Sequence, residues 1–215
     1  MSLPDALVAD ALALARTHAP DAATTSRTAV LGLAGGPGSG KSTLATALAA
    51  AVTTSGVEAV ALPMDGFHLS NAELERRHLA DRKGSPETFD CEGLAAILDA
   101  IRQPSGAAVW APAYSRELHE PVRSAIEVGP RVGLVIVEGN WLGLDAGEWL
   151  GVRARLDALW FLDVPWEVCR ERLVTRRVAT GREDVAARTW VDSVDAENYW
   201  LAQNSSRLAD RLITL

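Results

Sequence analysis

The sequence predicts a doubly wound α/β fold, in which a mainly parallel sheet is flanked by helices and carries a small lid. Short apolar runs of strand length alternate along the chain with segments whose apolar residues recur at helical spacing. The run from Val132 to Val137 is almost continuously apolar, which is typical of a central parallel strand buried on both faces. A strand, a glycine-rich loop, a helix and a second strand follow one another over 29–62, and this order requires a right-handed crossover between parallel strands.

The first part of the chain predicts one outer helix and the first strand–helix–strand unit. Apolar residues at helical spacing predict an amphipathic helix over 4–17, and a polar linker completes the N-terminal segment 1–27. A strand is predicted at 29–34, and the helix after the glycine-rich loop should end near residue 53, before a Ser-Gly pair. A second strand is predicted at 57–62 and is closed by a proline.

The rest of the chain continues the alternation between helices and strands, broken by two polar segments. The predicted elements are a short helix at 70–80, a helix at 91–102, a short strand at 107–110, strands at 132–137 and 156–162, helices at 165–179 and 183–202, and a terminal edge strand at 212–215. The polar segments 64–90 and 112–130 are longer than simple connections, so we expect them to be functional loops. A chain of 215 residues suits a single domain.

Composition excludes several classes of protein. The net charge of −7 and the pI near 5.1 give no basic footprint for nucleic acid or for an anionic membrane. Cys91 and Cys169 lie far apart without a C-x-x-C neighbour, so we expect two buried thiols rather than a disulfide or a zinc site. No apolar run reaches the length of a membrane span and the N-terminus does not resemble a signal peptide, which favours a cytoplasmic location.

Residues 35–42 form a complete G-x-x-x-x-G-K-[ST] P-loop between the first predicted strand and its helix. Glycines let the backbone N–H groups converge on phosphate oxygens, and the N-terminus of the following helix adds partial positive charge. Lys41 should reach the β- and γ-phosphates, while the Ser42 hydroxyl can ligate Mg²⁺. We therefore expect ATP and Mg²⁺ as cofactors, with the nucleotide held by Gly35, Gly36, Gly38, Ser39, Gly40, Lys41, Ser42 and Thr43.

Two carboxylates follow predicted strands at the edge of the sheet where ligands bind. Asp65 comes directly after the second strand, where an acceptor hydroxyl would meet the γ-phosphate, so it is the candidate catalytic base. The alternative is a turn aspartate before a glycine. Glu138 ends the strand that a Walker B motif would occupy, close to the Mg²⁺ shell of Ser42. Its alternative is a strand-end side chain in solvent.

Five arginines crowd the segment 170–183, which we expect to be a lid over the nucleotide. A planar guanidinium suits the charge that develops on a transferring phosphoryl group. Among Arg170, Arg172, Arg176, Arg177 and Arg182 we predict Arg176 as catalytic and Arg182 as nucleotide-binding. The alternative is a solvated basic helix face that pairs with Glu167 and Glu171.

The two polar segments carry aromatic and charged side chains that can form an acceptor pocket. Phe89 and Tyr114 would be its walls. The polar contacts to the acceptor would come from Asp90, Arg116 and His119, with His68 as a further candidate. Asp90 also fits the N-cap of the helix that follows it, and His68 could simply close its turn.

Taken together, these motifs resemble the uridine kinase, pantothenate kinase and phosphoribulokinase family of P-loop kinases. The blocks that carry the resemblance are Ala34–Thr43, Met64–His68, Arg82–Asp90, Pro112–Arg116 and Val137–Asn140, in the order of that family and within residues 28–200. The stretch Val137–Leu142 and the short chain are most similar to bacterial proteins described as fructose-transport-system kinases.

The resemblance implies a P-loop NTP hydrolase fold and assigns roles to the candidate residues. It makes Asp65 the catalytic carboxylate and Glu138 a holder of Mg²⁺, and it places Arg176 and Arg182 in a lid. It also implies acceptor contacts near Asp90, Tyr114 and His119, and a possible homodimer.

The function expected from these residues is ATP-dependent phosphorylation of a hydroxyl on a small polar metabolite, a sugar or polyol-like compound. Pantothenate or nucleoside kinase activity is the alternative within the family. The chain is shorter than pantothenate kinases, and His68 stands where uridine kinases carry an aromatic residue. A regulatory ATPase without an acceptor is the alternative of another class, whereas a GTPase switch is disfavoured because neither lysine lies in an Asn-Lys-x-Asp element.

Overall fold

A computed structural model describes residues 3–17, 27–103, 106–115 and 117–214 of the chain. Its centre is a sheet of five strands in the order β2-β5-β1-β6-β7, and every neighbouring pair is parallel. The strands are β1 (Ala29–Gly35), β2 (Ala59–Pro63), β5 (Leu134–Gly139), β6 (Ala158–Asp163) and β7 (Arg211–Thr214). The predicted α/β class, the parallel sheet and the terminal edge strand are confirmed.

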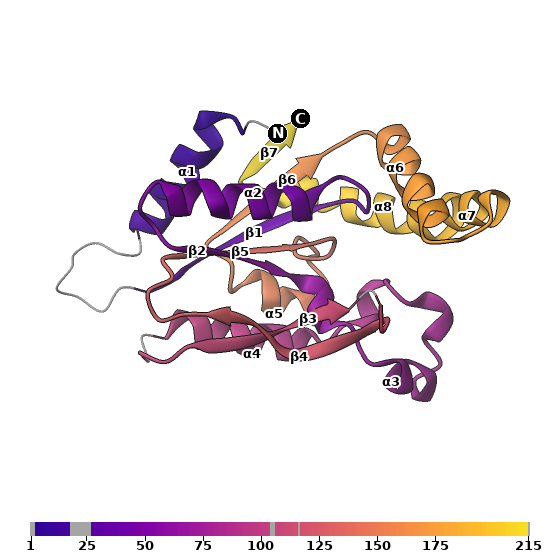
Figure 1. The fold of residues 1–215 in the computed structure, drawn as a ribbon, viewed down its shortest axis with the longest axis horizontal. Helices are drawn as coiled ribbons and strands as arrows, with labels where there is room; N and C mark the ends of the chain where they lie inside the picture. The colour runs from indigo at the N-terminus through magenta and orange to yellow at the C-terminus, as the bar shows by residue number, and fades with distance from the viewer. Residues whose placement is uncertain (1–2, 18–26, 104–105, 116, 215) are drawn as a thin grey trace.

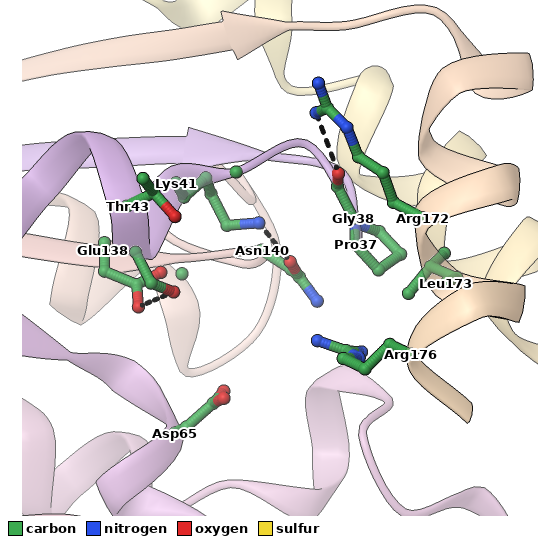
Figure 2. Close-up of a pocket in the computed structure, with 13 residues that line it drawn as sticks. Pro37, Gly38, Lys41, Thr43, Asp65, Glu138, Asn140, Arg172, Leu173 and Arg176 are labelled. Atoms are coloured by element: carbon green, nitrogen blue, oxygen red, sulfur yellow. Dashed lines mark hydrogen bonds between the residues drawn. The ribbon is translucent and has the colours of Figure 1, made fainter. Parts of the chain in front are cut away.

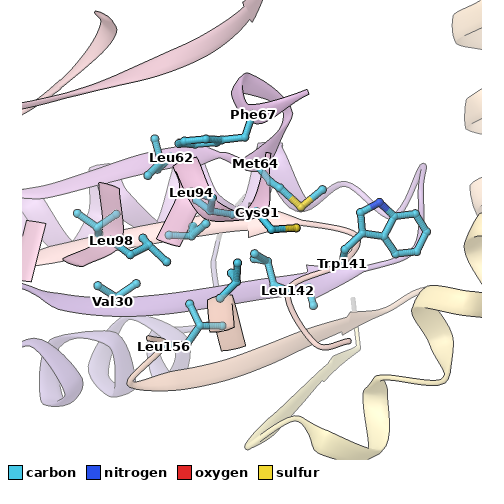
Figure 3. Close-up of a cluster of buried hydrophobic side chains, with 14 of the residues drawn as sticks. Val30, Leu62, Met64, Phe67, Cys91, Leu94, Leu98, Trp141, Leu142 and Leu156 are labelled. Carbon is cyan, nitrogen blue, oxygen red and sulfur yellow. The ribbon is translucent and has the colours of Figure 1, made fainter. Parts of the chain in front are cut away.

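Helices cover both faces of the sheet (Figure 1). One face carries α1 (Asp5–Thr17) and α2 (Lys41–Thr54), and the other carries α4 (Cys91–Arg102) and α5 (Trp149–Arg153). Because both faces are covered, every residue of β1 and β5 is buried, which is why these strands are apolar except for Glu138 near the end of β5. Figure 3 shows the core on the α4 side, where side chains from β1, α4 and the end of β2 meet around Leu94 and Leu98.

The segment 112–130, which the sequence predicts as a polar loop, forms most of a β-hairpin, so that prediction is wrong. Strands β3 (Val109–Ser115) and β4 (Glu120–Val128) pair antiparallel as a separate two-stranded sheet. The hairpin packs against α4 and the 3-10 turn Met64–Phe67 that follows β2. A Cβ atom at Gly66 would lie 2.2 Å from the Pro112 carbonyl oxygen, so glycine is required where the two backbones meet.

Residues 166–203 form a helical arm beside the sheet. Helix α6 (Trp166–Ala179) turns back into a second helical stretch, which the sequence predicts as one helix over 183–202. This stretch is α7 (Asp184–Trp190), a π-helical turn (Val191–Asp195) and α8 (Ala196–Gln203) in succession. The prediction is therefore confirmed in extent, while the π-helical turn inside it is new.

The remaining elements are short. The predicted helix 70–80 is confined to α3 (Asn71–Arg76), after which 3-10 turns cover Ala80–Arg82 and Pro86–Thr88, and a last one covers Ser206–Leu208. The five-residue helix α5 was not predicted, because its sequence holds a glycine and too few residues to show a helical period. Among the helices in the described ranges, none is both long and apolar enough to pass through a membrane.

Candidate active site

The P-loop joins β1 to α2 at the edge where the parallel strands end. Gly38 and Gly40 adopt left-handed backbone conformations with φ of 79° and 99°, which side chains disfavour. At Gly38 a Cβ would also lie 2.7 Å from the Cys169 carbonyl oxygen at the start of α6. The glycines of the motif therefore allow both the turn of the loop and its close contact with α6.

A cavity of about 330 Å³ opens above this loop. Figure 2 shows side chains from the P-loop, from the ends of β2 and β5, and from α6 directed toward one space. The lining residues are Pro37, Gly38, Gly40, Lys41, Ser42, Thr43, Asp65, Glu138, Gly139, Asn140, Arg172, Leu173 and Arg176. Three other predicted nucleotide-binding residues, Gly35, Gly36 and Ser39, belong to the same loop but do not line the cavity.

Lys41 lies at the base of the cavity and is almost completely buried. Its Nζ donates hydrogen bonds to the Gly36 carbonyl oxygen at 2.9 Å and to Oδ1 of Asn140 at 2.8 Å. Burial lowers the pKa of Lys41, and the charges of Glu138 and Asp65 oppose that effect. Sequence reasoning did not assign Asn140 a role, although its position two residues after Glu138 was a usable signal.

Ser42 and Glu138, the two residues expected to bind Mg²⁺, contact each other. The Ser42 hydroxyl donates a 2.6 Å hydrogen bond to Oε1 of Glu138, and Glu138 is only 5% exposed. The solvent-exposed alternative for Glu138 is therefore wrong. One hydroxyl and one carboxylate are hard oxygen donors of the kind that Mg²⁺ takes, together with water and nucleotide phosphates. No group of three or more His, Cys, Asp or Glu side chains able to hold a metal occurs within the described ranges.

Asp65 lies on the opposite side of the same cavity. It follows β2 in the 3-10 turn Met64–Phe67, and its carboxylate is directed into the open space facing the P-loop (Figure 2). Its charge acts on Lys41, as the effect on that lysine's pKa shows. The strand-end position predicted from the sequence therefore places a carboxylate across from the phosphate-binding groups.

Two arginines of α6 complete the lining. Arg172 and Arg176 stand four residues apart and so share one face of the helix. Arg172 Nη1 donates hydrogen bonds to the carbonyl oxygens of Ser39 at 3.1 Å and Gly38 at 3.3 Å. Arg176 matches its predicted place, whereas Arg172 was passed over. Its i,i+4 spacing from Arg176 was the signal that could have found it.

The other three arginines of the segment do not line the cavity. Arg170 pairs with Asp192, and Arg177 pairs with Asp195, so both face the next helix rather than Glu167 or Glu171. Arg182 lies beyond the end of α6 and is exposed. A nucleotide-binding role for Arg182 stays a prediction.

The acceptor-side segments meet in a cluster of rings next to Asp65. The imidazole of His68 lies 4.0 Å from the Phe89 ring and 5.0 Å from the Tyr114 ring, measured between centroids. Nδ1 of His68 lies 2.8 Å from the Asp65 carbonyl oxygen, which can only accept, so this nitrogen carries the proton. Burial lowers the pKa of His68, with the Asp65 charge opposing, which leaves Nε2 as a hydrogen-bond acceptor when the ring is neutral. Burial raises the pKa of the Tyr114 hydroxyl.

Among the predicted acceptor contacts, Asp90 and His119 make structural contacts within the polar segments. Asp90 caps α4 by accepting a 2.8 Å hydrogen bond from the Gly93 amide, so its N-cap interpretation is confirmed. His119 sits at the hairpin turn with φ of 53°, and its carbonyl oxygen accepts a hydrogen bond from Lys83 Nζ at 2.8 Å. Arg116 lies outside the described residues. Lys83 also stands 5.5 Å from the centroid of the Tyr114 ring, and sequence reasoning gave it no role.

Comparisons with known proteins agree with this geometry. The protein YggC of Escherichia coli, named as uncharacterized, is 38% identical over 192 residues, which cover 88% of this chain and 78% of YggC. The crystal structure of a protein from Silicibacter sp. TM1040, named putative fructose transport system kinase, is 35% identical with a TM-score of 0.85 over 99% of this chain and 100% of that one. The pantothenate kinase of Lacticaseibacillus casei is 39% identical over 112 residues, which are 51% of this chain and 36% of that enzyme. The model of the phosphoribulokinase / uridine kinase family matches residues 30–205, and the chain therefore belongs to this family of P-loop kinases.

Proposed function

We propose that this protein is an ATP- and Mg²⁺-dependent kinase that transfers the γ-phosphoryl group to a hydroxyl of a small polar metabolite, a sugar or polyol-like compound. The observation that carries the proposal is the single cavity between Lys41, the Ser42–Glu138 pair and Asp65. Groups of the P-loop line one side of it and the Asp65 carboxylate lines the other (Figure 2). An acceptor hydroxyl placed between them would lie next to a group that can take its proton.

Five of the lining residues have tasks in this mechanism. Asp65 orients the acceptor hydroxyl and accepts its proton as the phosphoryl group moves. Lys41 leaves Asn140 and the Gly36 carbonyl to neutralise phosphate charge, and Arg176 faces the charge that develops during transfer. Ser42 and Glu138 would hold Mg²⁺, which supplies further positive charge to the phosphates when bound.

The ring cluster beside Asp65 supports a small polar acceptor. His68 and Tyr114 offer hydrogen-bonding groups on an aromatic wall, which suits the alternating hydroxyl and carbon faces of a sugar or polyol. The similarity to a protein named for fructose transport favours the same class. The similarity to pantothenate kinase spans only 36% of that enzyme, which weakens the case for pantothenate.

An acceptor screen tests the proposal. ADP release from Mg²⁺-ATP is measured with sugars, polyols, pantothenate and nucleosides, for the wild-type protein and for Asp65→Asn. We expect release that depends on one sugar or polyol, and its loss in Asp65→Asn with ATP affinity unchanged. Asp81→Asn is the matched control, because this aspartate lies in the same polar segment but outside the cavity lining.

The alternatives give different results in the same screen. Dependence on pantothenate or a nucleoside would replace the acceptor class. ADP release that is the same with every compound and in the absence of any would identify a regulatory ATPase instead. Full acceptor-dependent activity in Asp65→Asn would refute the role of that carboxylate.

A further inference from the structure

Consecutive arginines at the end of α6 point to different sides of the helix. Arg176 lines the nucleotide cavity, while Arg177 reaches toward the second helical stretch of the arm. Arg177 donates two hydrogen bonds to Oδ2 of Asp195, from Nε at 3.1 Å and from Nη2 at 2.9 Å. The guanidinium also lies 5.1 Å from the centroid of the Trp190 ring. The contacts of Arg177 therefore hold the last turn of α6 at one rotation about its axis, and this rotation also sets the direction of Arg176.

The π-helical turn is what brings Asp195 to this position. Four successive buried residues of the stretch are spaced four apart, at Ala187, Val191, Asp195 and Tyr199. A regular α-helix has 3.6 residues per turn, so a spacing of four would carry each residue further around the helix axis. The wider π-helical turn over Val191–Asp195 removes that drift and keeps all four on the inner face.

The inner face connects the arm to both sides of the nucleotide cavity. Val191 packs in a small buried cluster with Leu173 and Val174 of α6. Tyr199 lies against the P-loop, since a Cβ atom at Gly36 would be 2.4 Å from its ring. Asp195 stands between these two contacts and is 8% exposed. Its place links the orientation of α6 to the position of the P-loop.

The ion pair is a poor candidate for a stability device. Burial raises the pKa of the Asp195 carboxyl, and the charges of Arg177 and, more weakly, Arg176 oppose this effect. Removing two charges from water offsets much of their attraction, so such a pair is weak evidence for added stability, whereas it can select one geometry. Asp195 is buried and Arg177 is half-buried, and a contact made by two guanidinium nitrogens next to a cavity-lining arginine fits the selection of one geometry.

We propose that Asp195 is a positioning residue, which acts through Arg177 to direct Arg176 at the phosphate end of the nucleotide. The inference rests on the proposed function, in which Arg176 interacts with the terminal phosphate of ATP. It extends that function to a residue on another element that does not line the cavity.

The chain supplies a matched control in a second ion pair between the same two elements. Arg170 of α6 pairs with Asp192 of the π-helical turn, but both side chains are substantially exposed, at 34% and 47%. Arg170 contacts both carboxylate oxygens of Asp192, but solvent screens the pair and neither residue lines the cavity. Asp192→Asn should therefore leave nucleotide binding as it is in the wild-type protein.

The test is a double-mutant cycle on nucleotide affinity, which needs no acceptor. Calorimetry gives the Kd of Mg²⁺-ATP and Mg²⁺-ADP, and their ratio reports contacts to the terminal phosphate. Arg176→Gln should lower the preference for ATP by about tenfold, the effect of one charged hydrogen bond. Asp195→Asn alone should lower the preference for ATP over ADP by about fivefold. When Arg176→Gln is already present, Asp195→Asn should leave this preference unchanged within about 1.5-fold, because the effects of coupled residues are not additive.

A purely structural role for Asp195 predicts another pattern. Asp195→Asn would then change the preference for ATP equally in both backgrounds, or lower only the melting temperature, and either result overturns the proposal. An Arg176→Gln variant with an unaltered ATP preference overturns it as well. If Asp195→Asn does not fold, Arg177→Lys replaces it in the cycle with the same expected outcomes, since lysine keeps a cation beside Asp195 but loses the two-nitrogen contact. If no compound in the ADP-release screen acts as an acceptor, the proposed function is refuted, but the double-mutant cycle can still be interpreted because it measures nucleotide affinity alone.

Discussion

Replacing Gly38 by alanine should destabilise the protein more than the same change at Gly40 in the same loop. Both residues have positive φ, which costs an alanine about 1–2 kcal/mol. At Gly40 the nearest heavy atom to the new Cβ is Arg172 Nη1 at 3.8 Å, an ordinary contact. At Gly38 it is the Cys169 carbonyl oxygen at 2.7 Å, a backbone atom that no rotamer change can move.

The close contact at Gly38 adds a second energetic term. Overpacking of this kind costs about 1–3 kcal/mol, which brings the total for Gly38→Ala to about 2–5 kcal/mol. In a domain of this size 1 kcal/mol corresponds to about 2–4 °C in melting temperature. We expect Gly40→Ala to melt about 2–8 °C below the wild-type protein, and Gly38→Ala a further 2 °C or more below that, by about that same relation.

Urea unfolding and thermal melts of the two variants measure this difference, and Mg²⁺-ATP affinity measured alongside reports on the loop. The Gly38→Ala change should also weaken ATP binding more, because the loop or α6 must shift to admit the methyl group. Equal destabilisation of the two variants would refute the reasoning, since it would mean that the contact with Cys169 carries no penalty.

Three further predictions concern the site. Glu138→Gln should raise the Mg²⁺ concentration needed for half-maximal ATP binding by about tenfold or more, measured by calorimetric titration with Mg²⁺; an unchanged requirement would remove Glu138 from the metal site. Burial holds the pKa of His68 below 6.5 in the folded protein, so the unfolded chain takes up a proton there more readily than the folded chain does. The free energy of unfolding, measured with urea, should therefore decrease as the pH falls below about 6.5, and it should decrease less in His68→Asn. Identical pH profiles of the two proteins would contradict this. Gly36→Ala should displace the Tyr199 ring and lower the free energy of unfolding, measured by thermal melting, by about 1–3 kcal/mol. Adding Tyr199→Leu should recover part of that stability, whereas two additive losses of stability would contradict the contact.

Motifs with a local physical cause were predictable from the sequence. The P-loop, its flanking strand and helix, and the buried strand ending in Glu138 each depend on residues close together in the chain. Asp65 was placed by a rule about strand ends, and the cavity contains it. The Asp90 cap follows from a side chain and an amide three residues apart.

The hairpin was missed because its strands lack the usual signal. Most of β4 is exposed or half-buried, so its residues do not alternate between apolar and polar. Pro112 and Pro121 lie in the paired strands, Ser124 has φ of 51°, and the register shifts between Ala111 and Ala113. What holds the hairpin is packing against α4 and the turn after β2, which the local sequence does not record.

The arginine choices show the same limit. The sequence indicated a basic helix. Which of its arginines face the cavity depends on which ones form ion pairs with the neighbouring helical stretch. Asp192 and Asp195 take Arg170 and Arg177, and that leaves the face of Arg172 and Arg176 for the nucleotide.

The strand order has a consequence for how the chain reaches its fold. The central strand β1 pairs with β5 and β6, and the partner of Ala29 is Leu134, which lies 105 residues later in the chain. During synthesis the P-loop strand would emerge long before either neighbour exists, with its apolar faces uncovered. Pairings this distant in sequence make folding slow and leave early intermediates prone to aggregation. The strand that leads into the P-loop would therefore be made early and paired late.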